Sequence, residues 1–214
     1  MYLPRHFLND DRSSVVDLIR GHPLATLVTM LDDQLEATHV PVVLDADRGE
    51  YGALRFHLAY ANPTAQVLDG AREVLLVFTG PEAYVSPDWY DTEQLVPTWN
   101  YAAVHMWGRP APVDDAALGR LLDDLSAEQE QQIPGKQPWT TAKLEEDRYL
   151  KMRRAIIGFD MMVSRLDAKW KMDQNKSRAD RQGARAALDA LGGERRTAVA
   201  TVMGSREANL SEDP

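Results

Sequence analysis

Three short segments of the chain combine residue types that suit ligand binding, and the first is RFHLAYANP, Arg55 to Pro63. It begins with the alternation of a strand, and Asn62-Pro63 is a common start of a helix. A helix start directs backbone N–H groups and the positive end of the helix dipole at its surroundings, which attracts phosphate. His57, on the polar side of the strand, could add a hydrogen-bond donor. The alternative is an ordinary surface corner between a strand and a helix.

The second segment is VPTWNYAAVHMWG, residues 96–108, which holds two tryptophans, a tyrosine and a histidine. Trp99 and Tyr101 fall on one side of the expected strand and Asn100 on the other. Flat rings beside the polar groups of Thr98 and Asn100 suit a heterocyclic ligand, with Asn100, expected at the surface, as the polar contact. The alternative is that the rings form a core face. Nearby, SPDWYD places two more aromatic residues on a turn, which suits a ligand site and a barrel cap equally.

The third segment is AKWKMDQNKS, residues 168–177. Lys169 and Lys171 alternate with apolar residues, so both ammonium groups should face one side of a strand. Gln174 and Asn175 follow, and amide side chains beside a cationic strand can read the polar edge of a ring system while a lysine neutralises a phosphate. The alternative is the exposed, basic end of a hairpin.

The composition limits the function classes. With 214 residues and no cysteine, the chain can bury a core without disulfides and has no thiolate nucleophile. A net charge of −9 argues against binding to nucleic-acid phosphates, and the lack of a long apolar run predicts a soluble, cytoplasmic protein without a membrane span. The five histidines lack metal-ligand spacing, and no catalytic acid or base stands out, so no reaction is assigned.

Hydrophobic periodicity predicts an α+β protein, a predominantly antiparallel β-barrel with peripheral helices and a helical C-terminal appendage. Six strands are expected, in residues 23–31, 35–45, 53–60, 73–87, 96–110 and 155–172, with a hairpin turn at 32–34, a break at Gly80-Pro81 and a bend near Asp167. Helices are expected after Asp10-Asp11, from Asn62 to near Gly70, after Asp114 or Asp115, from a capping box at Ser177 to Leu191, and over 194–203. Residues 1–191 would form one domain, and residues 192–214 a short helix and a disordered tail.

The same segments, with MYLPRHF and ATLVT, occur in this order in the PaiB-like family, whose members are bacterial proteins described as FMN-binding negative transcriptional regulators. From Met1 to about Leu191 the chain resembles them, and the combination of VPTWNY, SPDWY and QNKS is the specific part. The resemblance implies a split β-barrel like that of the pyridoxamine-phosphate-oxidase superfamily, and a homodimer with FMN near the subunit interface. The chain departs from the family at Thr64-Ala65-Gln66, where members carry a Trp-bearing helix start.

Nine residues are the FMN contacts that this resemblance implies. Those near the phosphate are His57 and Asn62. Those lining and closing the ring pocket are Thr98, Trp99, Asn100, Tyr101, Lys171, Gln174 and Asn175.

The resemblance implies a negative transcriptional regulator, or a flavin-dependent sensor or oxidoreductase. DNA binding has one candidate, the helix over 178–191 with Arg178, Arg181 and Arg185 at helical spacing, and the acidic total suggests that regulation is indirect. The alternative is a protein that binds or degrades haem, as other split-barrel proteins do, with His39 or His105 as axial ligand.

Overall fold

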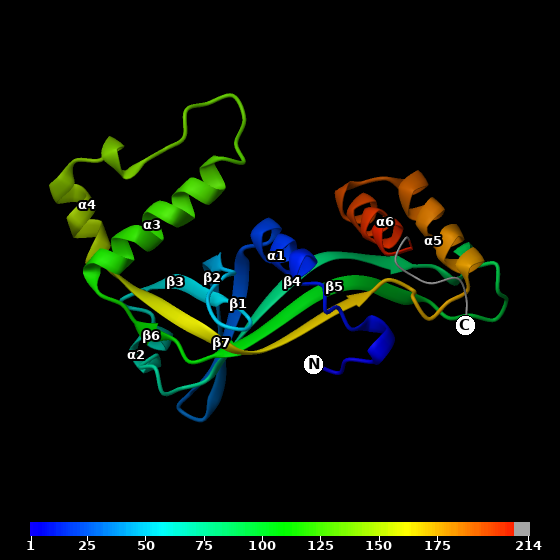
Figure 1. The fold of residues 1–214 in the computed structure, drawn as a ribbon, viewed down its shortest axis with the longest axis horizontal. Coiled ribbons are helices and arrows are strands. Elements are labelled where there is room, and N and C mark those ends of the chain that lie inside the picture. Colours follow the sequence, from blue (N-terminus) through cyan, green and yellow to red (C-terminus); the bar gives the residue numbers. More distant parts are fainter. Residues whose placement is uncertain (208–214) are drawn as a thin grey trace. The chain divides into compact units, whose positions relative to one another are not determined.

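The computed structural model describes residues 1–207, in which seven strands form an antiparallel sheet (Figure 1). The predicted tail falls partly on residues 208–214, which lie outside the described residues. The strands are β1 Leu24–Leu31, β2 Gln34–Asp45, β3 Ala53–Ala59, β4 Val74–Val85, β5 Thr98–Gly108, β6 Ala111–Pro112 and β7 Ile156–Lys171. Their order is β3-β2-β1-β4-β5-β7-β6, and β3 also pairs with β7, which closes a barrel. The predicted fold class is confirmed.

Six α-helices and three short 3-10 helices accompany the strands in the described part of the chain. The α-helices are α1 Arg12–Gly21, α2 Pro63–Val67, α3 Asp115–Glu130, α4 Glu146–Arg153, α5 Arg178–Leu191 and α6 Glu194–Glu207. The 3-10 helices are η1 Arg5–Phe7, η2 Pro87–Trp89 and η3 Thr141–Lys143. Within residues 1–207, none of the helices combines the length and the apolar character needed to cross a membrane.

The chain forms two compact units. The barrel unit comprises Val16–Phe78 and His105–Leu166, and the terminal unit comprises Met1–Val15, Thr79–Val104 and the described part of Asp167–Pro214. Strands β4, β5 and β7 contribute residues to both units. The division within β7 falls at Asp167, the position at which the sequence suggests a bend.

The predicted hairpin between β1 and β2 is confirmed. Leu31 pairs with Gln34, so the loop is the two residues Asp32 and Asp33, with φ of 49° and 60°. A two-residue hairpin loop of the twist-matched kind needs two left-handed residues, and aspartate tolerates that conformation better than most residues.

Strand β3 buries one face and keeps polar groups on the other, as predicted. Leu54, Phe56 and Leu58 are buried, whereas Arg55 and His57 are half-buried. Across the β3–β7 ladder Phe56 pairs with Phe159, and their rings stack with centroids 5.5 Å apart (Phe159 is also fully buried). This apolar contact holds β3 in the barrel wall with its polar face turned away from the barrel core.

Two local predictions are wrong, and one helix is missing from the prediction. Strand β4 continues through Gly80-Pro81, because its ladder with β1 covers only Leu75 to Val77 and a proline beyond it loses no bond to β1. Helix α2 ends at Val67, before Gly70. Helix α4 was not expected because its residues lack apolar periodicity, and the ion pair of Arg153 with Asp115 joins it to α3.

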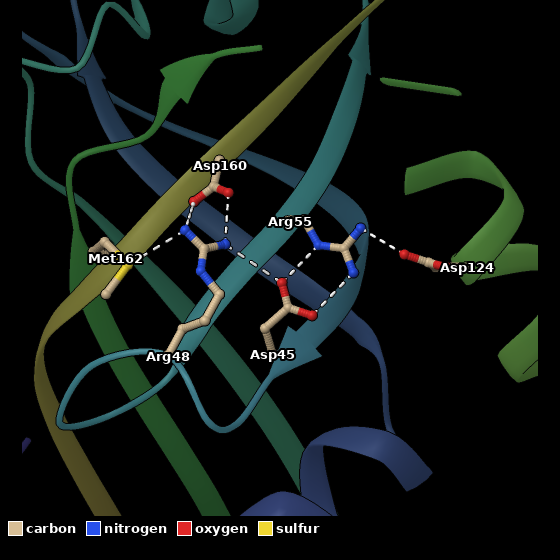
Figure 2. Close-up of polar contacts among 6 residues, drawn as sticks. All are labelled: Asp45, Arg48, Arg55, Asp124, Asp160 and Met162. Carbon is tan, nitrogen blue, oxygen red and sulfur yellow. Dashed lines mark hydrogen bonds and ion pairs between the residues drawn. The ribbon is translucent and has the colours of Figure 1, made fainter. Parts of the chain in front are cut away.

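Five charged side chains link strands of the barrel unit to α3 (Figure 2). Arg55 of β3 donates to both carboxylate oxygens of Asp45 on β2, at 2.7 and 2.9 Å, and to Asp124 of α3 at 2.7 Å. Arg48, in the turn after β2, donates to Asp160 of β7 at 2.7 and 3.2 Å. The side chain of Arg55 is 18% exposed, so its largely buried charge depends on these carboxylates. The network therefore fixes β3 relative to β2 and α3.

The charges of this network shift the pKa of its members. Burial alone would raise the pKa of Asp45, but the hydrogen bonds and charges of Arg55 and Arg48 outweigh burial and lower it below 3.8. The hydrogen bond with Asp45 raises the pKa of Arg55 despite burial. The Asp45 carboxylate therefore stabilises the fold above its ordinary pKa, and this stabilisation is lost as the pH falls through the lowered value.

Replacing Arg55 with methionine removes the charge that Asp45 and Asp124 share, and we expect the free energy of unfolding at pH 7 to fall by about 2 kcal/mol. The control Arg48→Met should cost less than about 1 kcal/mol, because that side chain is 43% exposed. Urea unfolding measures both, and the Arg55→Met difference should shrink near pH 3 as Asp45 takes up a proton. Equal losses for the two variants would contradict this account.

Candidate functional site

Strand β5 turns Trp99 outward and Asn100 inward. Trp99 is 53% exposed and Tyr101 is half-buried, whereas Asn100 is fully buried, as are Ala102 and Val104. The core-face alternative is therefore wrong for Trp99, and so is the expectation of a surface Asn100. Alternation separates the two sets but does not say which side is the interior. Here the interior takes the small and branched residues, and the asparagine with them.

A buried carboxylate, Asp173, holds the Asn100 amide within the terminal unit. Asn100 Nδ2 donates to Asp173 Oδ2 at 2.9 Å and contacts Met203 Sδ of α6 at 3.7 Å. Tyr90 OH donates to the same Asp173 oxygen at 3.2 Å. Burial, together with the charge of Asp173, raises the pKa of Tyr90, so the phenol stays a donor. These bonds compensate a carboxylate that is 2% exposed, and they join β5, the segment after β7 and the segment after η2.

Nothing in the sequence singles out Asp173, which lies between Lys171 and Gln174 in the third segment. Its signal is a positive φ of 60° directly after the buried Met172, and that is visible only in the structure. An aspartate tolerates this backbone conformation better than most residues.

The two lysines of β7 face the same side, as predicted. Lys171 Nζ donates to Thr98 Oγ1 at 2.5 Å and to the Trp99 carbonyl at 2.7 Å. Lys169 is 8% exposed, and its Nζ lies 5.4 Å from the centre of the Tyr101 ring. The exposed-hairpin alternative is therefore wrong for Lys169. Burial lowers the pKa of Lys171, and the charge of Asp173 offsets this only in part.

The two amides after β7 behave differently. Gln174 Oε1 accepts from the Met172 N–H at 2.7 Å, and its Nε2 donates to the Trp170 carbonyl, so the side chain closes a local turn. Asn175 is exposed. Of the seven implied ring-pocket residues, the structure thus joins Thr98 and Trp99 to Lys171, and it uses Asn100 and Gln174 for internal bonds.

The corner between β3 and α2, in the barrel unit, has the cap that the sequence predicts. Asn62 Oδ1 accepts from the Thr64 N–H at 2.9 Å, and Asn62 Nδ2 donates to Thr38 Oγ1 at 3.3 Å. The amide of Asn62 therefore shapes this corner. Helix α2 buries Thr64 and Ala65.

Two buried polar atoms of this corner have no hydrogen-bond partner, Nδ1 of His57 and Oγ1 of Thr64. His57 pairs across the ladder with Gly158, where an added Cβ would lie 3.0 Å from Leu118 of α3, so apolar side chains crowd this part of the sheet. Burial lowers the pKa of His57, and the ring is neutral at pH 7. Among the described residues, buried polar atoms without a partner also occur singly in Thr29, Asn100, Arg181 and Glu207, whereas this corner has two, which could serve the polar group of a ligand.

The histidines considered as haem ligands are placed differently from His57. His39 is exposed on β2, and His105 of β5 is half-buried with its ring 5.8 Å from that of Trp107. Within residues 1–207, no group of three histidine or carboxylate side chains is arranged to hold a metal ion.

Several solved structures share the fold of this chain. The FAD and heme binding protein of Mycobacterium smegmatis shares it with a TM-score of 0.57 at 17% identity, over 87% of this chain and 80% of that one. Flavocytochrome Anf3 of Azotobacter vinelandii shares it with a TM-score of 0.55 at 16% identity, over 78% and 72%. At such identities the likeness shows the fold alone, which is the split barrel that the sequence predicts.

Sequence relatives define the family. Residues 1–165 match the family described as "Putative FMN-binding domain", and the chain belongs to it. The chain is 30% identical over 180 residues to Protease synthase and sporulation protein PAI 2 of Bacillus subtilis (strain 168), covering 84% of this chain and 85% of that protein. It is also 30% identical over 244 residues to an uncharacterized protein of Emericella nidulans, covering 96% and 97%. The resemblance to the PaiB-like family is confirmed, and relatives also occur outside bacteria.

The family makes FMN the cofactor of this chain, and the β3–α2 corner fits it. The imidazole of His57 and the hydroxyl of Thr64 can both donate to phosphate oxygens, and both have a buried atom that lacks a partner. Thr64 was not among the implied contacts. The feature of the sequence that could have indicated Thr64 is its position two residues after Asn62, the N-cap of α2.

Replacing Asn100 with alanine removes a hydrogen bond from the buried Asp173, and we expect the free energy of unfolding to fall by about 2 kcal/mol. The control is Asn175→Ala, an exposed amide three residues before the Arg178 start of α5, which should change it by less than about 0.5 kcal/mol. Urea unfolding followed by far-ultraviolet circular dichroism gives both values. Wild-type stability in Asn100→Ala would show that the buried cluster does not hold the terminal unit together.

Proposed function

We propose that this chain is an FMN-dependent redox protein, a sensor or an oxidoreductase, in which the β3–α2 corner binds the FMN phosphate. The observation that carries the proposal is the pair of buried, unpartnered atoms of His57 and Thr64. Asn62 holds the corner in shape through its cap of α2 and its bond to Thr38. When bound, the flavin supplies the electron-transfer chemistry, and the protein binds and orients it.

The residues expected to line and close the flavin ring pocket remain part of the proposal. Their roles differ. Tyr101 offers a half-buried ring, and Lys171 offers a cation fixed by Thr98. Asn100 and Gln174 act through the backbone they hold. A homodimer with flavin near the subunit interface, as in the family's fold class, belongs to the same proposal.

The structure gives little support to direct DNA binding as the basis of a regulatory role. Helix α5 carries the arginines considered for it, but Arg181 Nη1 donates to the Lys176 carbonyl at 2.6 Å and Arg185 Nη1 pairs with Glu207 at 3.3 Å. Two of the three guanidinium groups are thus engaged within the terminal unit, in a protein of net charge −9. We therefore propose that any effect on transcription is transmitted through the state of the flavin.

The variants His57→Leu and Thr64→Val should each weaken FMN binding by about tenfold, because each removes a donor to the phosphate, and should change riboflavin binding less than about twofold. Thr29→Val is the matched control, since Thr29 Oγ1 is also buried without a partner but lies on β1. Quenching of flavin fluorescence measures all affinities. Lys171→Met, measured in the same way, tests whether the ammonium group of Lys171 contributes to FMN binding. Equal losses for FMN and riboflavin in His57→Leu and Thr64→Val would exclude this corner as the phosphate site.

The affinity for FMN should also depend on pH. The pKa of His57 is lowered in the free protein, and a bound phosphate would raise it, so binding takes up a proton. Affinity should therefore increase as the pH falls from about 8 to about 6.5, by up to about tenfold for each unit of that pKa change. His57→Gln should remove the dependence, as should the replacement of FMN by riboflavin. A slope that persists in His57→Gln would assign the proton to another group.

A further inference from the structure

Lys169 carries a nearly buried ammonium group in the terminal unit, and the described residues place no carboxylate in an ion pair with it. The residue is 8% exposed, and of the three N–H donors on its Nζ one meets the Tyr2 carbonyl, at 3.2 Å. The rings of Tyr101, Phe7 and Tyr2 lie 5.4, 5.8 and 5.9 Å from Nζ. Cation–π contacts offset part of the cost of taking an ammonium group out of water. The cost that remains favours an anion at this position.

The charges around Lys169 leave an excess of positive charge. Lys171 follows two residues later on the same side of β7, and the Phe7 ring lies 5.8 Å from the Nζ atoms of both lysines. Burial lowers the pKa of Lys171 most, and of the charges nearby Asp173 raises it, whereas Lys169 and Lys176 lower it. Asp173 already accepts two hydrogen bonds from within the unit. The lysines therefore outnumber the carboxylate that acts on them.

The chain segment over Lys169 can admit a ligand. This segment is Met1–Pro4, and its contacts with β7 include the ion pair of the Met1 ammonium with Asp167 and the Tyr2 carbonyl on Lys169. Tyr2 is 85% exposed, so its side chain is not packed in a core. A carboxylate is a stronger acceptor for an ammonium group than a peptide carbonyl, and a local movement of this segment would let it replace the Tyr2 oxygen. Asp167 stays paired with Met1 in this exchange.

We propose that Lys169 and Lys171 bind the carboxylate of a small organic anion, the molecule that the flavin site senses or converts. The inference rests on the proposed function, in which Lys171 and Tyr101 line the flavin ring pocket. Lys171 keeps one donor free beside its bonds to Thr98 and Trp99, and Lys169 keeps two. A carboxylate between the two ammonium groups can accept from both. The rings beside Lys169 offer apolar contact to the organic part of such a ligand, which inorganic phosphate lacks.

The proposal is tested by isothermal titration calorimetry of the FMN-free full chain with benzoate, and with benzamide as the neutral analogue of the same size. We expect benzoate to bind with a Kd of about 1 mM or tighter, and benzamide at least about tenfold more weakly. Lys169→Met keeps most of the bulk of the side chain without its charge, and it should weaken benzoate binding by about fivefold or more. The matched control Lys151→Met, at an exposed lysine of α4 in the barrel unit, should not change it.

Equal binding of benzoate and benzamide to the wild type would overturn the proposal, and this comparison holds even if Lys169→Met does not fold. Unchanged benzoate affinity in a folded Lys169→Met would overturn it as well. Lys169→Arg, which keeps the charge, should retain more of the benzoate affinity than Lys169→Met does.

Further titrations separate this inference from the phosphate assignment. His57→Leu should bind benzoate as the wild type does, and Lys169→Met should bind FMN within about twofold of the wild type. Benzoate should also change the absorption spectrum of the flavin in the FMN-loaded chain, and binding without such a change would overturn its placement at the flavin site. Displacement of benzoate by FMN but not by riboflavin would assign the FMN phosphate to these lysines and overturn the proposal. If benzoate binds and FMN does not, the proposed function fails and the carboxylate site stands without the flavin.

Discussion

The barrel unit depends on how it compensates the largely buried charge of Arg55. A guanidinium taken out of water needs carboxylates at hydrogen-bond distance, and Asp45 and Asp124 provide them from β2 and α3 (Figure 2). Once Arg55 is fixed, β3 is fixed in register and in rotation. His57, two residues on, must then point to the same face as Arg55. The ion pairs thereby help to determine the position of the imidazole that we propose as a contact of the FMN phosphate.

The terminal unit also compensates a buried charge, but with neutral hydrogen-bond donors. Asp173 is an almost fully buried carboxylate, and a neutral amide and a phenol from other elements compensate it. The contrast between Asn100 and His57 is instructive. The Asn100 amide donates to Asp173, which explains its place in a structural cluster. Both residues have a buried atom without a partner, Oδ1 of Asn100 and Nδ1 of His57, and His57 carries the functional proposal because Oγ1 of Thr64, in the same corner, lacks a partner as well.

Local signals account for what the sequence predicted correctly. The alternation of β3, the Asp32-Asp33 turn and the caps at Asn62 and Ser177 depend on neighbours within a few positions, and the structure shows each of them. The family resemblance supplied the split barrel and FMN, which periodicity alone could not.

The misses have a common physical cause, which is dependence on distant residues. Asn100 is buried because Asp173, 73 positions away, accepts from it. Helix α4 is joined to α3 by Arg153 and Asp115, 38 positions apart, and it lacks its own apolar stripe. Strand alternation identified two faces of β5 but could not say which was interior. The assignment of individual FMN contacts depends on such distant contacts too, and it stays a prediction.

The measurement that tests the central claim most directly is the ¹⁵N NMR spectrum of histidine-labelled protein, titrated with FMN and then with riboflavin. The ring nitrogens of His57 are identified by their loss in His57→Gln. The account predicts that FMN shifts these resonances toward the protonated imidazole and that riboflavin, which has no phosphate, does not. If both flavins shift the His57 resonances equally, or if FMN binds and leaves them unchanged, the phosphate does not lie at the β3–α2 corner and the account is wrong.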